Sequence, residues 1–230
     1  MTERRSIDGP VGPIEIALDW PATAPLGCAY IGHPHPLYGG TLDNKVAATL
    51  ARAFVALGFV SVRPNFRGVG GSAGVHDHGV GETEDLLHLM RSVPPLLGVA
   101  SGSVALAGFS FGSFVAARAV QQLQGSAAPA HVVLVGTAAG KWPMPPVPAH
   151  TLVIHREYDE TIPLADVLAW ARPLDLPVVV LPGADHFFHR RLSILKRLVI
   201  AHVHAQREVA SGVEELGRRG RTEAKVDGTG

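Results

Sequence analysis

Short apolar runs alternate along the chain with longer stretches in which apolar residues recur every three or four positions. The short runs lie at residues 14–18, 28–31, 60–63, 104–107, 132–135, 152–155 and 178–181. Most are rich in Val, Ile and Leu throughout, which is typical of strands covered on both faces, as in a parallel sheet. Helices are predicted by the periodic stretches at residues 44–57, 82–93, 111–123, 163–171 and 192–207. This alternation predicts an α/β protein with a mostly parallel central sheet and helices on both faces.

The two ends of the chain depart from this alternation. The runs at residues 14–18 and 28–31 leave no room for a helix between them, so we expect an antiparallel start to the sheet. From Gly217 the chain is rich in Gly and Arg and has no aromatic residue, which predicts a disordered polar tail. We therefore expect one α/β domain over residues 1–216 and a tail over residues 217–230.

Composition narrows the class of protein. The chain has 230 residues, 47% hydrophobic and 17% charged, as expected for one packed domain. Because 20 Lys and Arg balance 20 Asp and Glu, we expect neither nucleic acid nor an anionic membrane as a partner. The one cysteine, Cys28, cannot form an internal disulfide. No secretory signal is visible and no apolar run is long enough for a bilayer, which favours a cytoplasmic protein.

A candidate nucleophile follows the fourth apolar run. Gly108-Phe109-Ser110-Phe111-Gly112 stands between a predicted buried strand and a predicted helix. This arrangement predicts a sharp turn that lifts Ser110 above the sheet at a helix N-terminus, with glycines where a Cβ would clash. The same pattern recurs around Ser72, but no buried strand directly precedes it and no helix follows. We therefore interpret Ser72 as a loop residue and Ser110 as the nucleophile; the alternative is a glycine-rich turn without chemistry.

A serine nucleophile needs a histidine base and a carboxylate that orients it, here expected on loops after later strands. Asp159 follows the run at residues 152–155, with Glu157 and Glu160 as neighbouring alternatives. A purely structural role for Asp159, capping the next turn or helix, is the other interpretation. His186 follows the run at residues 178–181, and its alternative is His189. The order Ser110, Asp159, His186 is thus nucleophile, acid, base, as expected when the acid and the base follow later strands.

The loop at residues 32–40 is expected to complete the site. A tetrahedral oxyanion needs two N–H donors. The backbone N–H of Phe111 would be one, and that of His35 the other, with Leu37 as second choice, because Pro34 and Pro36 have no N–H. His33 and His35 also suggest a metal site, but no third ligand stands at a sensible spacing, so we expect neither metal nor cofactor.

A further loop, at residues 65–72, is rich in glycine. It lacks the Gly-Lys-Ser/Thr ending and the helix-opening third glycine of phosphate-binding loops. We expect it to pack beside the rim of the active site, with Arg67 paired to Asp85 or Glu82.

These motifs resemble the α/β-hydrolase superfamily. More narrowly, residues 33–45 (HPHPLYGGTLDNK), 65–70 (NFRGVG) and 79–82 (GVGE) resemble small, lidless bacterial hydrolases related to dienelactone hydrolases and short-chain carboxylesterases. The resemblance runs from about residue 10 to 205. It implies Ser110 as nucleophile, Asp159 as acid, His186 as base, and His35 and Phe111 as oxyanion donors. Dienelactone hydrolases have cysteine at the nucleophile, so a dienelactone substrate is not expected.

The substrate class follows from the length of one connection. Lids in this fold usually lie between the strand after the nucleophile helix and the acid strand, and only 15 residues, four of them proline, separate Val135 from Thr151. We expect no cap domain and an open site for small, soluble esters. The leading hypothesis is a carboxylesterase with a Ser110 acyl-enzyme, acting as a monomer or homodimer. Alternatives are a thioesterase or peptidase of the same fold, and a non-catalytic binding module.

Overall fold

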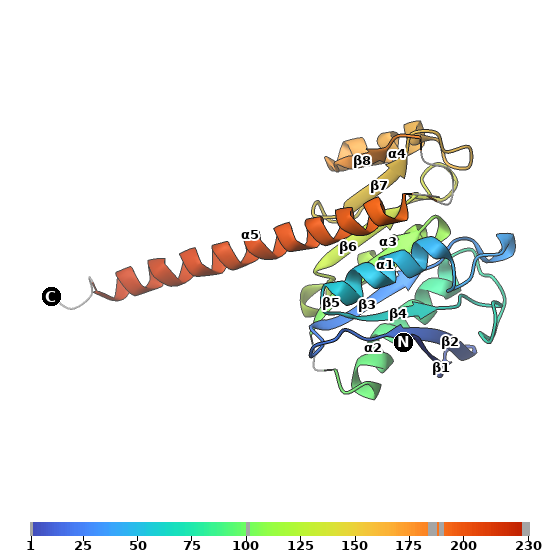
Figure 1. Ribbon diagram of the computed structural model, residues 1–230, viewed down its shortest axis with the longest axis horizontal. Helices are drawn as coiled ribbons and strands as arrows, with labels where there is room; N and C mark the ends of the chain where they lie inside the picture. The colour runs from blue at the N-terminus through green and yellow to red at the C-terminus, as the bar shows by residue number, and fades with distance from the viewer. Residues whose placement is uncertain (1, 100–101, 184–187, 189–190, 227–230) are drawn as a thin grey trace.

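The computed structural model describes residues 2–99, 102–183, 188 and 191–226. In this part of the chain, eight strands form one sheet in the order β1-β2-β4-β3-β5-β6-β7-β8 (Figure 1). Their bounds are β1 Thr2–Gly9, β2 Gly12–Asp19, β3 Gly27–Gly32, β4 Val60–Pro64, β5 Ser103–Phe109, β6 His131–Val135, β7 Leu152–Arg156 and β8 Val178–Leu181. The pairs β1–β2 and β2–β4 are antiparallel, and all pairs from β4 to β8 are parallel. The predicted mostly parallel sheet is confirmed.

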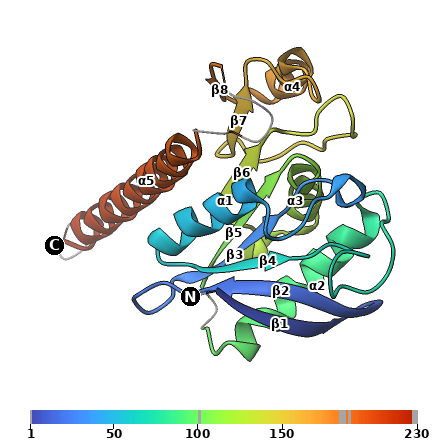
Figure 2. The ribbon, with the colours of Figure 1, turned by 45° about the vertical axis from the view of Figure 1, so that its right-hand side comes forward.

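Helices cover both faces of this sheet, as the alternation predicted. They are α1 Lys45–Ala56, α2 Val80–Leu96, α3 Phe111–Gln122, α4 Leu164–Ala171 and α5 Leu192–Val226, with short 3₁₀ helices η1 Pro36–Tyr38, η2 Gly125–Ala127 and η3 Arg172–Leu174. One apolar core joins α1 and α5 to one face of the sheet, and a second joins α2, α3 and α4 to the other face (Figures 1 and 2). The fold is that of an α/β hydrolase.

The antiparallel start of the sheet differs from the expectation in two ways. β2 does not pair with β3, which follows it in the chain; it pairs with β4, in the register Leu18 to Val62. An additional strand, β1, forms the edge of the sheet and pairs with β2. The apolar pattern could not reveal β1, because its side chains are mostly exposed polar residues that bury no face.

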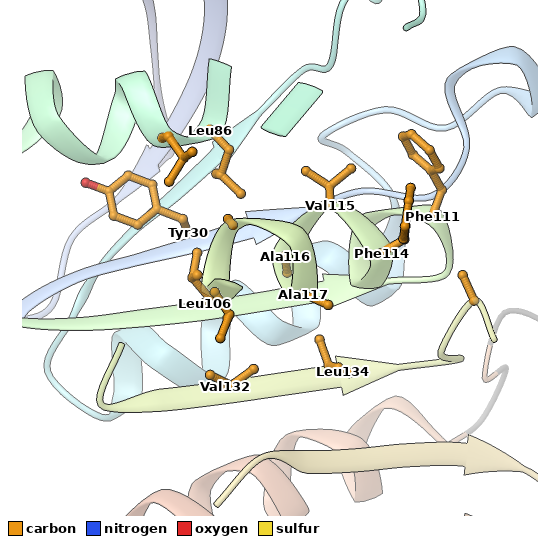
Figure 3. Close-up of a cluster of buried hydrophobic side chains, with 14 of the residues drawn as sticks. Tyr30, Leu86, Leu106, Phe111, Phe114, Val115, Ala116, Ala117, Val132 and Leu134 are labelled. Carbon is orange, nitrogen blue, oxygen red and sulfur yellow. The ribbon is translucent and has the colours of Figure 1, made fainter. Parts of the chain in front are cut away.

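The core under α3 fixes the position of the candidate nucleophile. Figure 3 shows Leu106 of β5 and Val132 and Leu134 of β6 packed beneath α3, with Ala116 and Ala117 among the helix residues drawn there. All five side chains are buried. Small residues on a helix let its backbone approach the sheet closely, so α3 is held with its N-terminus at the carboxyl end of β5.

The connection between β6 and β7, residues 136–151, contains no helix or strand beyond the isolated bridge between Ala139 and Trp142. All of its residues are described. The prediction that this connection carries no cap domain is therefore confirmed.

Helix α5 is longer than the pattern at residues 192–207 predicted, because it continues to Val226. Its first turns bury Leu195, Val199 and Val203 in the core shared with α1, and its distal part extends away from the sheet (Figure 1). The segment predicted as a disordered tail thus lies within α5 from Gly217 to Val226, and residues 227–230 lie outside the described part. The division at residue 216 stays a prediction. Within the described residues, α5 and the other helices all lack the length or the apolar character needed to cross a bilayer.

Candidate active site

Ser110 occupies a strained turn between β5 and α3. Its backbone angles are φ 53° and ψ −122°, a conformation that costs a non-glycine residue about 1–3 kcal/mol. Three hydrogen bonds hold it there. The Ser110 N–H donates to the carbonyl of Val135 at 2.9 Å, and its own carbonyl accepts from the N–H and the hydroxyl of Ser113 at 2.8 and 2.6 Å. The surrounding backbone therefore fixes the side chain at the top of the sheet.

The two glycines flanking Ser110 are required by close backbone approaches. A Cβ on Gly108 would lie 2.1 Å from the carbonyl oxygen of Gly112, and a Cβ on Gly112 would lie 2.4 Å from the backbone of Gly32. Both distances are far below van der Waals contact, and the atoms met are backbone, which cannot swing aside. The strand, turn and helix predicted around Ser110 are all present, for the steric reason given from the sequence.

Ser72, the serine of the second Gly-x-Ser-x-Gly pattern, is a loop residue, as predicted. Its buried hydroxyl accepts from the N–H of Glu15 at 3.0 Å and donates to the carbonyl of Asn65 at 2.8 Å. With its hydroxyl used in this way, Ser72 ties the glycine-rich loop to β2.

The loop after β3 brings His35 to the same cavity as Ser110 and Phe111. Within the described residues, neither the His35 N–H nor the Phe111 N–H has a hydrogen-bond partner. The second-choice donor, Leu37, is different: its N–H donates to Nδ1 of the His35 ring at 3.2 Å. The carbonyl of His35 accepts from the N–H groups of Tyr38 and Gly40 at 3.1 and 3.0 Å, which holds the loop in a tight turn.

His33 anchors this loop, a role that the sequence did not indicate. The ring is fully buried; Nδ1 lies 2.6 Å from the carbonyl of Pro34, and Nε2 accepts from the N–H of Phe66 at 3.0 Å. Because one ring nitrogen faces an acceptor and the other a donor, the ring is neutral with its proton on Nδ1. Burial lowers the pKa of His33 to about 4. Both nitrogens are engaged, so His33 offers no lone pair to a metal.

The cavity in front of Ser110 has a volume of about 450 Å³. The described residues that line it are Pro34, His35, Tyr38, Gly39, Gly40, Asn44, Ser110, Phe111, Ala138, Lys141, Trp142, Thr161 and Ile162. Aromatic rings dominate one side: Trp142 stacks on Phe114 with ring centroids 5.2 Å apart and lies 5.0 Å from Phe111 and 5.7 Å from His35. Burial, followed by the nearby His76, lowers the pKa of His35, so this ring is neutral at pH 7.

Asp159 follows β7 and is buried, whereas its alternatives Glu157 and Glu160 are exposed. Its Oδ1 accepts from the N–H groups of Thr161 and Ile162 at 2.8 and 2.9 Å, and these two residues line the cavity. The structural role considered for Asp159, capping the next turn, is therefore present.

The other carboxylate oxygen of Asp159 faces positively charged and polar groups. Oδ2 forms an ion pair with the buried guanidinium of Arg156. Nε2 of His155 lies 3.7 Å from the same oxygen and 2.9 Å from the carbonyl of Ile162. Arg156 thus compensates the buried charge of Asp159, which the sequence did not predict.

The predicted base, His186, and its alternative His189 lie outside the residues that the structure describes. The described part of the chain brings Ser110, His35 and Phe111 to one cavity, and Asp159 holds the wall formed by Thr161 and Ile162.

Arg67 forms one of the two ion pairs that the sequence suggested. Its guanidinium donates to both carboxylate oxygens of Asp85, at 2.9 and 3.0 Å, and both side chains are buried. Glu82, the other suggested partner, instead accepts from the N–H groups of Asp77 and Gly79, at 2.8 Å each. Its Oε1 lies 3.0 Å from Nδ1 of His76, whose ring packs against His35 and Phe111.

Comparison with known proteins extends these observations. Residues 21–140 match the family model described as X-Pro dipeptidyl-peptidase (S15 family). A crystal structure from Xanthomonas campestris, described as an α/β serine hydrolase without a lid, is 35% identical, with a TM-score of 0.80 over 89% of this chain and 94% of the other. An α/β serine hydrolase homologue from Coxiella burnetii is 38% identical, with a TM-score of 0.75 over 87% of this chain and 97% of the other.

A curated relative is also similar. An uncharacterized protein of Rickettsia prowazekii (strain Madrid E) is 40% identical over 121 residues, which make up 50% of this chain. The alignment spans about half of that relative, 48% of its length.

Proposed function

Because the chain belongs to the X-Pro dipeptidyl-peptidase (S15) family of α/β hydrolases, we propose that it is a serine hydrolase that cleaves small, soluble carboxylic esters through an acyl-enzyme on Ser110. The observation that carries the proposal is the conformation of Ser110. A non-glycine residue that three hydrogen bonds hold at φ 53°, in the same cavity as two residues whose N–H groups have no partner among the described residues, has the arrangement that a nucleophile needs.

In the proposed mechanism, His186 removes the proton from the Ser110 hydroxyl as its oxygen attacks the ester carbonyl. The N–H groups of His35 and Phe111 stabilise the oxyanion that develops. His186 then returns the proton to the departing alcohol, leaving the acyl-enzyme. A water molecule activated by the same imidazole releases the acid. Asp159 orients His186 and stabilises its positive charge.

The expected preference for small esters is supported by the connection between β6 and β7. Residues 136–151 form an irregular segment without a helix, so the connection provides no cap over the cavity. The cavity formed by the described residues, of about 450 Å³, has room for a short acyl group. We therefore expect short-chain esters to be hydrolysed faster than long-chain esters, and comparable rates would contradict this part of the proposal.

A peptidase is the second candidate, because the description of the matched family names an X-Pro dipeptidyl-peptidase. The match at residues 21–140 includes His35, Ser110 and Phe111 but not Asp159 or His186. The same chemistry acts on esters, thioesters and amides. Measuring kcat/KM on a short 4-nitrophenyl ester, a matched thioester and an X-Pro 4-nitroanilide separates these activities.

Labelling with a fluorophosphonate probe tests the central proposal. We expect the wild-type protein and Ser72→Ala to be labelled, and Ser110→Ala to remain unlabelled and to lose at least about 10³-fold in ester hydrolysis. Ser72→Ala is the matched control, because it removes a serine from the same pentapeptide pattern; circular dichroism checks that all three proteins are folded. Unchanged labelling of Ser110→Ala, or an unlabelled wild-type protein, would favour the non-catalytic binding module. A cytoplasmic location and a monomeric or homodimeric state stay predictions.

A further inference from the structure

The described residues that line the Ser110 cavity include several hydrogen-bond donors and no carboxylate. Among the described lining residues there is no Asp or Glu, and Lys141 is the residue with a full charge at neutral pH. The backbone N–H groups of His35 and Phe111 are available at one side. A cavity with donors and no carboxylate complements a ligand that is rich in acceptors or negatively charged.

Asn44 adds a donor of fixed orientation. Its Oδ1 caps α1 by accepting from the N–H groups of Val46 and Ala47, at 2.9 and 3.3 Å. The capping bonds assign the oxygen to the helix, so the Nδ2 amide remains for the cavity that Asn44 lines. Within the described residues, this amide has no acceptor.

Lys141 stands on an anchored segment of the cavity wall. The N–H groups of Lys141 and Trp142 both donate to the carbonyl of Ala138, at 3.3 and 3.1 Å, and the Trp142 ring is held against Phe111 and Phe114. The backbone at Lys141 is therefore fixed at the edge of the cavity. In the described part of the chain, the ammonium group forms no ion pair or hydrogen bond. Asp166 of α4 packs against the neighbouring Gly140 but does not line the cavity.

From this donor set we infer that the Ser110 site selects esters whose acyl group carries a carboxylate, and that Lys141 and Asn44 are the residues that determine this specificity. The inference rests on the proposed serine hydrolase activity and adds its substrate class. The carboxylate would meet the ammonium of Lys141 and the amide of Asn44 while the ester carbonyl occupies the oxyanion site. Neither side chain takes part in bond breaking.

Two esters that differ by one terminal carboxyl group test this selection. Ethyl pentanoate is neutral, and monoethyl adipate carries an additional terminal carboxylate; hydrolysis of both is followed by titration of the released acid at constant pH. We expect the ratio of kcat/KM, anionic over neutral, to exceed one in the wild-type protein. Because exposed charges interact weakly in water, Lys141→Met should lower this ratio by about three- to tenfold and Lys141→Arg by less than about twofold.

A second variant reports on Asn44 without removing the helix cap. Asn44→Asp retains a capping oxygen but replaces the amide donor by a negative charge, so the ratio should fall by at least as much as in Lys141→Met. Because both residues line the cavity, the kcat/KM of each variant on the neutral ester serves as its own reference, and the ratio alone tests the inference. Lys196→Met, on α5 and away from the cavity lining, makes the same change in net charge and should leave the ratio unaltered. Raising the salt from about 0.05 to about 0.5 M should reduce the wild-type ratio toward that of Lys141→Met.

The failures of the two proposals are distinguishable. A ratio that is unchanged in both Lys141→Met and Asn44→Asp, while Ser110-dependent hydrolysis of the neutral ester persists, overturns this inference and leaves the hydrolase proposal intact. Labelling of Ser110 without hydrolysis of either ester overturns this inference and the ester substrate of the proposed function, and leaves Ser110 as the nucleophile. A protein that hydrolyses neither ester and is not labelled at Ser110 overturns the proposed function, and the inference with it.

Discussion

Lowering the pH should destabilise the protein through His33. The buried ring accepts from the N–H of Phe66 through Nε2, and a second proton would occupy the lone pair that makes this bond. The pKa of His33 is about 4 in the folded protein, against about 6.5 for a histidine in an unfolded chain. Because the folded pKa is the lower one, the stability contributed by the neutral ring is fully present above pH 6.5 and is lost as the pH falls toward 4.

The magnitude follows from these two values. The full loss is about 3 kcal/mol, and between pH 7 and pH 5 the ring should account for about 2 kcal/mol of the free energy of unfolding. His33→Gln removes the titration but keeps an oxygen that can accept from the Phe66 N–H. Urea unfolding of both proteins, followed by tryptophan fluorescence and circular dichroism at pH 7 and pH 5, measures the difference.

The other histidines titrate in both proteins and cancel from the comparison. We expect the wild-type protein to lose about 2 kcal/mol more than His33→Gln between the two pH values. His204→Gln, which changes an exposed histidine on α5, should behave like the wild-type protein. A pH dependence of His33→Gln within about 0.5 kcal/mol of the wild-type value would refute the assignment of a neutral, buried His33.

Two further substitutions test the support of the site. Asp85→Ala leaves the buried Arg67 without its bidentate partner and should lower the free energy of unfolding by about 3–5 kcal/mol. Glu84→Gln changes an exposed partner of the same guanidinium and should lower it by less than about 1 kcal/mol. Equal losses for the two variants in urea unfolding would contradict the importance of the buried pair. Gly112→Ala places a Cβ 2.4 Å from the backbone of Gly32 and should lower the free energy of unfolding by about 3 kcal/mol or prevent folding. Gly98 has a left-handed φ but open space around it, so Gly98→Ala should lower the free energy of unfolding by about 1 kcal/mol. A lower melting temperature for Gly98→Ala than for Gly112→Ala would contradict the steric explanation.

The sequence predicted the elements that bury apolar residues and missed the one that does not. The seven apolar runs all correspond to strands, because a strand covered on both faces has to be apolar along its length. β1 lies at the exposed edge of the sheet, where backbone hydrogen bonds to β2 suffice, and its polar side chains leave no periodic pattern. An apolar run marks a strand but not its neighbours in the sheet. The pattern therefore could not show that β2 pairs with β4 and not with β3, the strand that follows it in the chain.

Within the site, the residues that could be predicted are those whose roles are set by local chemistry. The glycines around Ser110 and the missing N–H groups of Pro34 and Pro36 constrain the backbone within a few residues of the chain. By contrast, the partner of His33 is the N–H of Phe66, and no spacing rule connects the two. The packing of Trp142 on Phe114 likewise depends on how β6 and α3 are placed in the fold.

His33 connects the stability of the fold to the proposed chemistry of the site. The ring holds the carbonyl of Pro34 on one side and the backbone of Phe66 on the other, and the N–H proposed as an oxyanion donor belongs to the next residue after Pro34, His35. Because proline restricts the backbone between them, a rotation of the His33 ring out of its site would displace the His35 N–H as well. Protonation of His33 would therefore disturb the oxyanion site locally before the whole domain unfolds. Because a protonated His186 could not act as the base in either protein, the two proteins have to be compared with each other. We expect ester hydrolysis by the wild-type protein to fall at a higher pH than that by His33→Gln, at pH values where the far-ultraviolet circular dichroism of both proteins is unchanged; equal pH profiles would contradict the coupling.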